Sequence, residues 1–270
     1  MPTQSRTPAE EPHRARHMAE SFGADPERYD RTRPRYPDAL VRRIADAAPG
    51  PALLDVGCGT GIAARQFLAA GCTVLGVDAD PRMAAFARGG GLDVEVSGFE
   101  TWDAGGRTFD AVVAGQTWHW IDPAAGAAKA ADVLRPGGRI ALFWNVHRPA
   151  PDLAEAFSAA HLAELPDAPR NPWARATLDA YGPVFAAVAD GLRTDGSFGE
   201  PEEWRFDWER TYTRDEWLEQ MRTSGEAGQY TPERLTALLT GTSAVIDALG
   251  GTFTMPYTAV VVTATRTVTP

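Results

Sequence analysis

The segment 53–61, Leu-Leu-Asp-Val-Gly-Cys-Gly-Thr-Gly, constrains the fold more than any other part of the chain. Its apolar beginning predicts a buried strand, and its three alternate glycines predict a tight loop that leads into a helix. Glycine is required where φ is positive or where a Cβ would collide with a bound molecule. Gly57, Gly59 and Gly61 therefore predict a loop whose main chain lies against a cofactor.

Asp55 distinguishes between classes of cofactor. In dinucleotide-binding enzymes a glycine-rich turn holds a pyrophosphate, which a neighbouring carboxylate would repel. S-adenosylmethionine has no phosphate and carries an ammonium and a sulfonium, which an acidic residue attracts. The dinucleotide pattern G-x-G-x-x-G fails when it starts at Gly57, because Ile62 stands at its last position, but it is loosely met from Gly59 to Ala64. The residues favour S-adenosylmethionine, and the spacing alone leaves a dinucleotide open.

A second acidic residue, Asp78, lies 21 residues after Gly57. The apolar segment 72–77 predicts a second strand, and a carboxylate at the end of that strand is placed to accept hydrogen bonds from ribose hydroxyls. The alternative is that Asp78 caps the following helix, but Asp80, next to Pro81, is better placed for capping. Asp78 is therefore predicted to bind the ribose of the cofactor.

Four segments occur in the order and spacing of class I S-adenosylmethionine-dependent methyltransferases, and the resemblance covers about residues 28–145. These segments are 55–61, 76–78, 109–113 and 133–139. Within that superfamily the chain resembles the small-molecule branch related to ubiquinone-biosynthesis and trans-aconitate methyltransferases. Two motifs suggest this branch: Tyr29-x-x-x-Arg33-Pro34-x-Tyr36-Pro37 and the Gln-Thr-Trp-His-Trp sequence at 116–120.

The resemblance implies an α/β fold: a Rossmann-like seven-stranded sheet with helices on both faces, a helical lid insert and an antiparallel last strand, for which 257–265 is the candidate. Strands that alternate with helices indicate right-handed crossovers and a parallel sheet. Periodicity predicts strands at 52–56, 72–77, 93–97, 109–114, 139–144 and 204–211. It predicts helices at 19–30, 38–48, 61–70, 81–88, 123–134, 213–223 and 232–249.

Four regions are expected along the chain. Residues 1–18 are polar and predicted to be disordered, and 19–145 form the cofactor-binding core. The helical stretches 152–164 and 173–190 break the alternation, so 146–203 is predicted to be a lid or substrate insert. Residues 204–270 are expected to complete the core with further strands and helices.

The resemblance also implies the remaining cofactor contacts. Phe99 and Glu100 would pass beside the adenine, although Ser97 and Gly98 replace an acidic residue that the family often has here. The full predicted cofactor set is Tyr29, Arg33, Tyr36, Asp55, Gly57, Gly59, Gly61, Asp78, Met83, Phe99, Glu100 and Gln116. The alternatives are a core position for Met83 and a solvated helix face for the arginines.

The segment 116–120 follows the fourth strand and is expected to border the methyl group and its acceptor. Methyl transfer is an in-line displacement, so the protein mainly holds the nucleophile in a dry, oriented site. His119 is the candidate general base; the alternative is a histidine that points back into the fold. The predicted substrate residues, each with core packing as its alternative, are Trp118, Trp120, Trp144, Trp173 and Tyr181.

Composition limits the remaining choices. The chain has 270 residues, 44% of them hydrophobic, which suits one α/β core. A net charge of -10 would repel nucleic acid and favours a small, apolar or aromatic acceptor. No apolar run would span a membrane and no signal peptide is evident, so a cytoplasmic location is expected. Cys58 and Cys72 form no metal-binding pattern, and no metal is predicted.

Two other functions would keep the same motifs. One is a methyltransferase-fold protein that uses bound S-adenosylmethionine without redox chemistry for a cyclisation or elimination. The other is a non-enzymatic module that only binds the cofactor. The aromatic residues of the insert favour a transferase, with S-adenosylhomocysteine as product. The single lysine, Lys129, and the abundant alanine are typical of GC-rich bacterial coding. The sequence determines neither the acceptor atom nor the oligomeric state.

Overall fold

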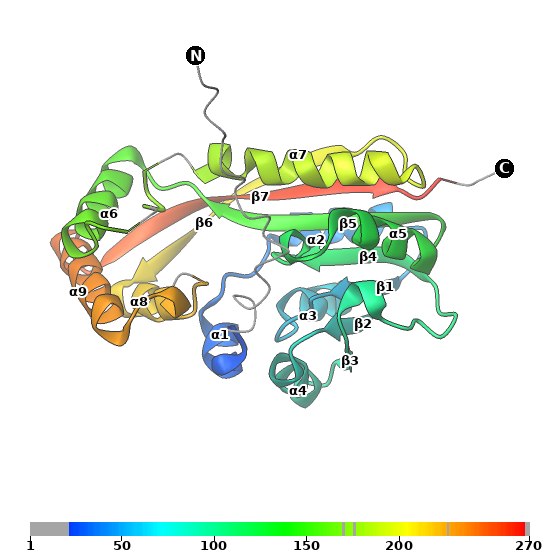
Figure 1. The fold of residues 1–270 in the computed structure, drawn as a ribbon, viewed down its shortest axis with the longest axis horizontal. Coiled ribbons are helices and arrows are strands. Elements are labelled where there is room, and N and C mark those ends of the chain that lie inside the picture. Colours follow the sequence, from blue (N-terminus) through cyan, green and yellow to red (C-terminus); the bar gives the residue numbers. More distant parts are fainter. Residues whose placement is uncertain (1–21, 169–170, 175–176, 226, 268–270) are drawn as a thin grey trace, which may run out of the picture.

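A computed structural model describes residues 22–168, 171–174, 177–225 and 227–267, and it contains a seven-stranded sheet of order β3-β2-β1-β4-β5-β7-β6 (Figure 1). Strands β1 to β5 run parallel, and β7 runs antiparallel to both β5 and β6. This order confirms the predicted sheet and its antiparallel last strand. The strands are β1 (Ala52–Val56), β2 (Thr73–Asp78), β3 (Asp93–Val96), β4 (Phe109–Gly115), β5 (Leu134–His147), β6 (Glu202–Thr213) and β7 (Thr252–Thr265).

Helices cover both faces of the sheet, as predicted. The helices are α1 (Pro26–Thr32), α2 (Asp38–Ala47), α3 (Ile62–Ala69), α4 (Pro81–Gly89), α5 (Pro123–Val133), α6 (Pro151–Glu164), α7 (Thr177–Asp195), α8 (Arg214–Arg222) and α9 (Pro232–Ala248). Helices α2, α3 and α4 pack on one face, and α5 and α7 on the other. Burial from both sides explains why β1 and β4 are almost continuously apolar.

The strands β5, β6 and β7 are longer than expected, and two of them support a separate helical layer. The sequence predicts 139–144, 204–211 and 257–265, whereas the strands span 134–147, 202–213 and 252–265. Besides the two hydrophobic clusters on the faces of the sheet, another cluster joins α6, α8 and α9 to Tyr212, Phe253 and Tyr257 on β6 and β7. We call this layer the cap: α6, α8 and α9 with strand segments 211–213 and 252–257. Figure 1 shows its helices together at one end of the molecule.

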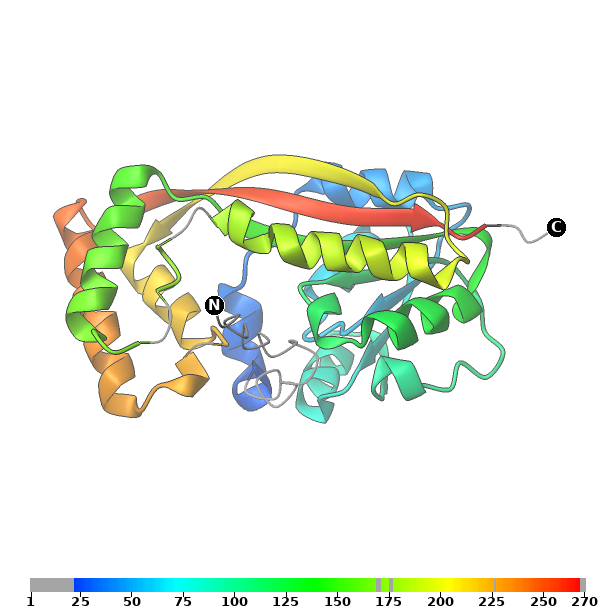
Figure 2. The same ribbon diagram turned by 45° about the horizontal axis from the view of Figure 1, so that its top comes forward.

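The contacts group the helices differently from the predicted regions. Helix α7, expected in the insert 146–203, runs along the sheet (Figure 2) and buries Phe185, Val188 and Leu192 in the main core. Helices α8 and α9, expected to complete the core, belong to the cap instead. The physical reason is the length of β6 and β7, which carries the chain away from the parallel strands. The predicted disordered segment 1–18 lies outside the described residues.

The described residues also limit other kinds of site. Cys58 and Cys72 are buried and form no disulfide. Among the described residues, no group of histidine, cysteine and acidic side chains is arranged to hold a metal ion. No helix in that part of the chain is both long enough and apolar enough to cross a membrane.

Candidate functional site

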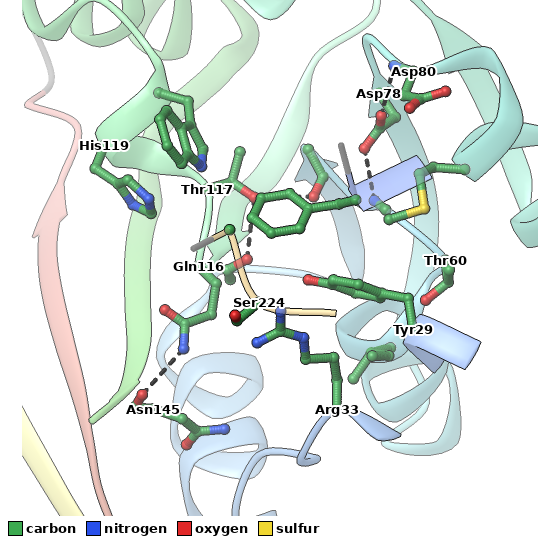
Figure 3. Close-up of a pocket in the computed structure, with 18 of the residues that line it drawn as sticks. Tyr29, Arg33, Thr60, Asp78, Asp80, Gln116, Thr117, His119, Asn145 and Ser224 are labelled. Carbon is green, nitrogen blue, oxygen red and sulfur yellow. Dashed lines mark hydrogen bonds between the residues drawn. The ribbon is translucent and has the colours of Figure 1, made fainter. Parts of the chain in front are cut away.

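A cavity of about 1090 Å³ separates the carboxyl edge of the parallel strands from the cap (Figure 3). One half, which we call the cofactor half, is lined by the segments that follow β1, β2, β3 and β4. The other half, the cap half, is lined by residues from the end of β5, from α8 and α9, and from β7. Open α/β sheets bind ligands at this edge because the loops there converge.

The glycine loop joins β1 to α3 with positive φ at all three glycines. A Cβ on Gly59 would project toward the cavity, because its nearest neighbour outside the adjacent residues is Met83 Cε at 3.9 Å. A Cβ on Gly61 would instead approach Leu92 Cδ1 to 2.1 Å. Gly57 and Gly59 line the cavity, but Gly61 does not. The prediction that Gly61 contacts the cofactor is therefore not supported; packing against Leu92 explains this glycine.

Asp78 holds the same loop from the end of β2. Its Oδ2 accepts a hydrogen bond from the Gly59 N–H at 2.7 Å, and its Oδ1 accepts one from the Asp80 N–H at 2.8 Å (Figure 3). Burial raises the pKa of the Asp78 carboxyl. Asp80 caps α4 by accepting from the Arg82 N–H at 2.9 Å. Capping thus belongs to Asp80, and Asp78 lines the cavity.

Asp55 is a buried acid whose second oxygen lacks a partner. Its residue exposure is 1%, and Oδ2 has no hydrogen-bond partner among the described residues. Burial, reinforced by the charge of Asp78, raises the pKa of the Asp55 carboxyl to about 8. A buried carboxylate is strongly unfavourable unless a cation or donors compensate it. The site therefore fits a ligand that brings a positive charge to Asp55, as the ammonium of S-adenosylmethionine would.

The predicted adenine contacts line the cavity beyond β3. Phe99 and Met83 are 4% and 5% exposed, so each presents only part of its surface to a ligand. Glu100 lines the cavity, and its Oε1 accepts from the Asp122 N–H at 3.1 Å. This bond ties the segment after β3 to the loop that begins α5.

Gln116 follows β4 with φ 59°, the only non-glycine residue with positive φ in the described part of the chain. Its N–H donates to the Phe143 oxygen at 2.8 Å, and its Nε2 donates to the Asn145 oxygen at 3.1 Å (Figure 3). A non-glycine residue with this backbone conformation costs about 1–3 kcal/mol. Such residues occur where surrounding contacts hold the backbone in place, commonly at functional sites. Gln116 lines the cavity where its two halves meet.

His119 lines the cavity, and one of its ring nitrogens accepts a hydrogen bond from another side chain of the protein (Figure 3). Its Nδ1 accepts from the Trp144 Nε1–H at 3.3 Å, and its ring lies 4.6 Å from that of Trp120. Burial lowers the pKa of His119 to about 4. A neutral imidazole that accepts at Nδ1 carries its proton on Nε2. In this state the ring is a hydrogen-bond donor through its Nε2–H, and the role of general base stays a prediction.

Two predicted substrate residues are not at the cavity. Trp118 is 2% exposed and packs against Phe99 at 5.9 Å between ring centroids. Trp144 is fully buried under α7, where it contacts Phe185 at 5.4 Å, and it reaches the site only through His119. Neither residue lines the cavity, so their direct contact with an acceptor is corrected to core packing. The other three predicted residues, Trp120, Trp173 and Tyr181, do line it.

The N-terminal motif lies at the junction of the two halves. Tyr29, Arg33 and Tyr36 all line the cavity. The Arg33 guanidinium lies 4.8 Å from the centre of the Tyr29 ring and donates to the carbonyl of Thr223, just after α8. Tyr36 packs edge-on against Phe143 at 4.6 Å. Arg33 thus joins α1 to the cap across the cavity.

Several residues that line the cavity were not predicted from the sequence. The main ones are Asn145, His147, Trp217, Gln220 and Tyr257. Asn145 interrupts an apolar strand, which is a signal that sequence reasoning missed. His147, Gln220 and Tyr257 lie in segments that look like ordinary strands or an amphipathic helix, and Trp217 is marked only by the high aromatic content of 204–217.

The comparisons with known proteins agree with this geometry. A family model described as a methyltransferase domain matches residues 54–142. An uncharacterized methyltransferase of Mycobacterium tuberculosis is 38% identical over 133 residues, 48% of this chain and 54% of that protein. The aligned region thus spans about half the length of that relative. Nocamycin O-methyltransferase of Saccharothrix syringae is 35% identical over 192 residues, 62% of this chain and 68% of that protein.

A solved structure shows the same fold over most of the chain. It is that of a proposed type II methyltransferase from Anaeromyxobacter dehalogenans, with a TM-score of 0.61 and 23% identity. The alignment covers 86% of this chain and 97% of that one. The narrower resemblance to ubiquinone-biosynthesis and trans-aconitate methyltransferases stays a prediction. From the motifs, the sheet order and these similarities, the chain belongs to the class I S-adenosylmethionine-dependent methyltransferases.

Proposed function

We propose that this chain transfers a methyl group from S-adenosylmethionine to a small-molecule acceptor bound between the sheet and the cap. The observation that carries this proposal is that one cavity contains both the glycine loop with its two acids and an aromatic cap half. Its volume of about 1090 Å³ lies above the roughly 300–1,000 Å³ typical of a single ligand site, which supports room for a cofactor and an acceptor together.

In this proposal the cofactor half binds S-adenosylmethionine, which supplies an electrophilic methyl group when bound. Asp55 meets the ammonium through its unpartnered oxygen, and Asp78 accepts hydrogen bonds from the ribose. Gly59 leaves room for the ligand because it has no Cβ. The remaining proposed contacts are Tyr29, Arg33, Tyr36, Gly57, Met83, Phe99, Glu100 and Gln116, all of which line the cavity.

The chain contributes to the reaction mainly by orientation and by excluding water. Gln116 is fixed by two hydrogen bonds, and His119 is fixed by Trp144. We assign His119 as a neutral donor that orients the acceptor through Nε2–H. Holding two reactants in line contributes about 7–11 kcal/mol in favourable cases, which a displacement reaction can use without a strong base. The net charge of -10 and the aromatic lining support a small uncharged acceptor.

Parallel calorimetric titrations with S-adenosylmethionine, S-adenosylhomocysteine and NADH test the cofactor assignment. Micromolar binding of the first two and none of NADH is expected. Metabolite pools are then incubated with the protein and S-adenosylmethionine and searched for products that gain a methyl group. A product of changed structure without a methyl gain would indicate cyclisation or elimination instead. Tight NADH binding without a response to the sulfonium would contradict the proposal.

Binding of S-adenosylmethionine is expected to release a proton near neutral pH. The pKa of Asp55 is raised to about 8 in the free chain, so its carboxyl is mostly protonated at pH 7, whereas a nearby ammonium favours the ionised form. Affinity should therefore rise between pH 6 and 8, by at most about tenfold per unit. Calorimetry at pH 7 in buffers of different ionisation enthalpy measures the released proton. Asp55→Asn is the control and should release none.

The same pKa shift sets the sign of the stability change without cofactor. The pKa of Asp55 is higher in the folded chain than in the unfolded chain, so protonation favours folding. This contribution is complete below about pH 4 and is lost as the pH rises through about 8. Wild-type protein should therefore lose stability relative to Asp55→Asn between pH 5 and 8. A parallel pH dependence in the two proteins would contradict the assignment.

Replacing His119 with glutamine is expected to slow methyl transfer by less than about tenfold, because glutamine still offers an N–H donor, whereas loss of a general base costs about 10²–10⁴. His119→Phe, which offers no donor, should be slower than His119→Gln. Initial rates with the acceptor found by the screen measure both variants. A loss near 10³ in His119→Gln, together with a wild-type rate that rises through an ionisation near pH 6.5, would instead support a general base.

A further inference from the structure

Two polar groups of the cap half have no hydrogen-bond partner among the described residues. They are the indole Nε1–H of Trp217 and the amide Oε1 of Gln220, and both atoms are buried. Trp217 and Gln220 both line the cavity. They lie three positions apart on α8, so they are neighbours on one face of that helix. An unpartnered hydrogen-bond donor and an unpartnered acceptor therefore belong to neighbouring side chains that line the cap end of the cavity.

Leaving such groups unsatisfied is costly, at about 1–3 kcal/mol for each buried donor or acceptor. The hydroxyls of Tyr212 and Tyr257 bond each other at 2.7 Å, and the Gln220 side chain also hydrogen-bonds to both tyrosines. The Gln220 Oε1 atom itself has no partner among the described residues. The Trp217 ring is held by Phe157, stacked at 6.1 Å, and by Phe253 at 5.2 Å. Because the indole is fixed in this aromatic packing, its N–H direction is set before any ligand arrives.

The charges around the cavity restrict the ligand further. The carboxylates that line it in the described part of the chain are Asp55, Asp78, Asp80 and Glu100, all in the cofactor half. In the cap half, burial lowers the pKa of His147 to about 4, so its ring is neutral. Arg33 donates to the Thr223 carbonyl but keeps its positive charge, with a buried Nε–H that has no partner among the described residues, and Arg234 is exposed. A cationic group beside Trp217 would therefore meet no carboxylate among the described lining residues of the cap half.

The walls of the cap half are aromatic. His147 and Trp173 lie 5.3 Å apart, Trp173 and Trp217 lie 6.3 Å apart, and His147 and Tyr257 lie 6.5 Å apart, all between ring centroids. All four residues line the cavity. Such surfaces favour a flat apolar ligand that stacks or packs edge to face.

We infer that the acceptor molecule is aromatic and carries no positive charge at its cap end, where it presents a hydroxyl or an amide group. This group accepts a hydrogen bond from Trp217 Nε1–H and donates one to Gln220 Oε1. The inference rests on the proposed function for the identity of the ligand as the methyl acceptor, but the hydrogen-bonding site itself is independent of the cofactor. It anchors the end of the acceptor away from the methyl group.

Binding of simple probes tests this inference. Two probes donate and accept hydrogen bonds: 2-naphthol and 2-naphthamide. Each has a methylated partner that accepts but does not donate: 2-methoxynaphthalene for the naphthol and N,N-dimethyl-2-naphthamide for the amide. Affinities are measured by calorimetry or ligand-observed NMR on protein saturated with S-adenosylhomocysteine. We expect at least one donating probe to bind about tenfold more tightly than its methylated partner, as one buried hydrogen bond predicts. Preference for the naphthol pair or the amide pair identifies which group the site takes.

Variants separate the hydrogen bonds from the packing. Trp217→Phe keeps an aromatic ring but removes the N–H, and it should weaken the donating and methylated probes alike, because both accept. Gln220→Met keeps the length of the side chain and should abolish the preference for the donating probe. Trp173→Phe, the matched control, should weaken all probes by a similar factor and keep the preference. Circular dichroism and thermal unfolding verify that each variant is folded.

The outcomes are distinguishable from those for the proposed function. If S-adenosylhomocysteine binds but no probe binds, or the wild type shows no preference, the inference fails while the proposed function stands. A preference that survives Gln220→Met, or unchanged affinities in Trp217→Phe, also overturns it. If S-adenosylhomocysteine does not bind, the proposed function fails, and the same titrations on the free protein still decide whether the cap site exists.

Discussion

Asp78→Ala is expected to reduce the affinity for S-adenosylhomocysteine by at least about 100-fold, since hydrogen bonds to a charged group contribute about 1.5–3 kcal/mol each. The loss has two sources. The variant lacks the proposed ribose acceptors, and it also leaves the N–H groups of Gly59 and Asp80 without the carboxylate that holds them. The glycine loop should therefore be both less attractive to the ligand and less ordered. Calorimetric titration of the purified variant measures the effect.

The matched control is Asp80→Ala, two positions along the chain. Asp80 caps α4 and pairs with Arg82, so its loss should cost about 1 kcal/mol of stability, which is typical of an N-cap. Although Asp80 also lines the cavity, its effect on S-adenosylhomocysteine affinity should be under about threefold, because Arg82 engages both of its carboxylate oxygens. If Asp80→Ala weakens binding as much as Asp78→Ala, the distinction between ribose acceptor and helix cap is wrong.

Gly59→Ala is expected to weaken cofactor binding by about 100-fold or more while leaving the protein folded, because a Cβ there would occupy space that the ligand needs. The new Cβ would project toward the cavity with no protein atom nearer than Met83 Cε at 3.9 Å among those beyond its neighbours. The backbone strain at φ 56° costs about 1–2 kcal/mol for a non-glycine residue, which a stable domain tolerates. The decisive measurement pairs calorimetry with thermal unfolding of the same sample.

Gly61→Ala should show the opposite balance. Its Cβ would approach Leu92 Cδ1 to 2.1 Å, and its φ of 86° is also unfavourable, so unfolding free energy should fall by more than in Gly59→Ala. Because Gly61 does not line the cavity, the folded fraction at low temperature should bind S-adenosylhomocysteine nearly as wild type does. Equal losses of affinity in the two variants would show that both glycines act only through the loop conformation.

The parts of the site that the sequence predicted well are those built by short segments. The order apolar strand, acid, glycines predicted β1, its loop and the start of α3, and the structure places them at 52–56 and 62–69. The assignment of Asp80 rather than Asp78 as helix cap is also confirmed. These features depend on backbone conformation and on hydrogen bonds within a few residues, which local sequence specifies.

Predictions that depended on the direction of a side chain were less reliable. Trp118 and Trp144 lie in the predicted segments, yet neither of them lines the cavity. A shift of one residue in a strand or a short turn moves a side chain from the cavity to the core. For His119 the segment was right, since the residue lines the cavity, but its hydrogen-bond partner Trp144 comes from β5, and the local motif does not specify that bond.

The sequence by itself therefore determined the fold class, the cofactor loop and the acids at its edges, because these are encoded in residues close together in the chain. Only the tertiary structure decided the cap half. The long pairing of β6 with β7 carries α8 and α9 beyond the parallel strands, where they meet α6. Trp217 and Gln220 reach the cavity through this pairing, and no local pattern specifies it, because contacts between distant segments depend on how strands and helices pack together.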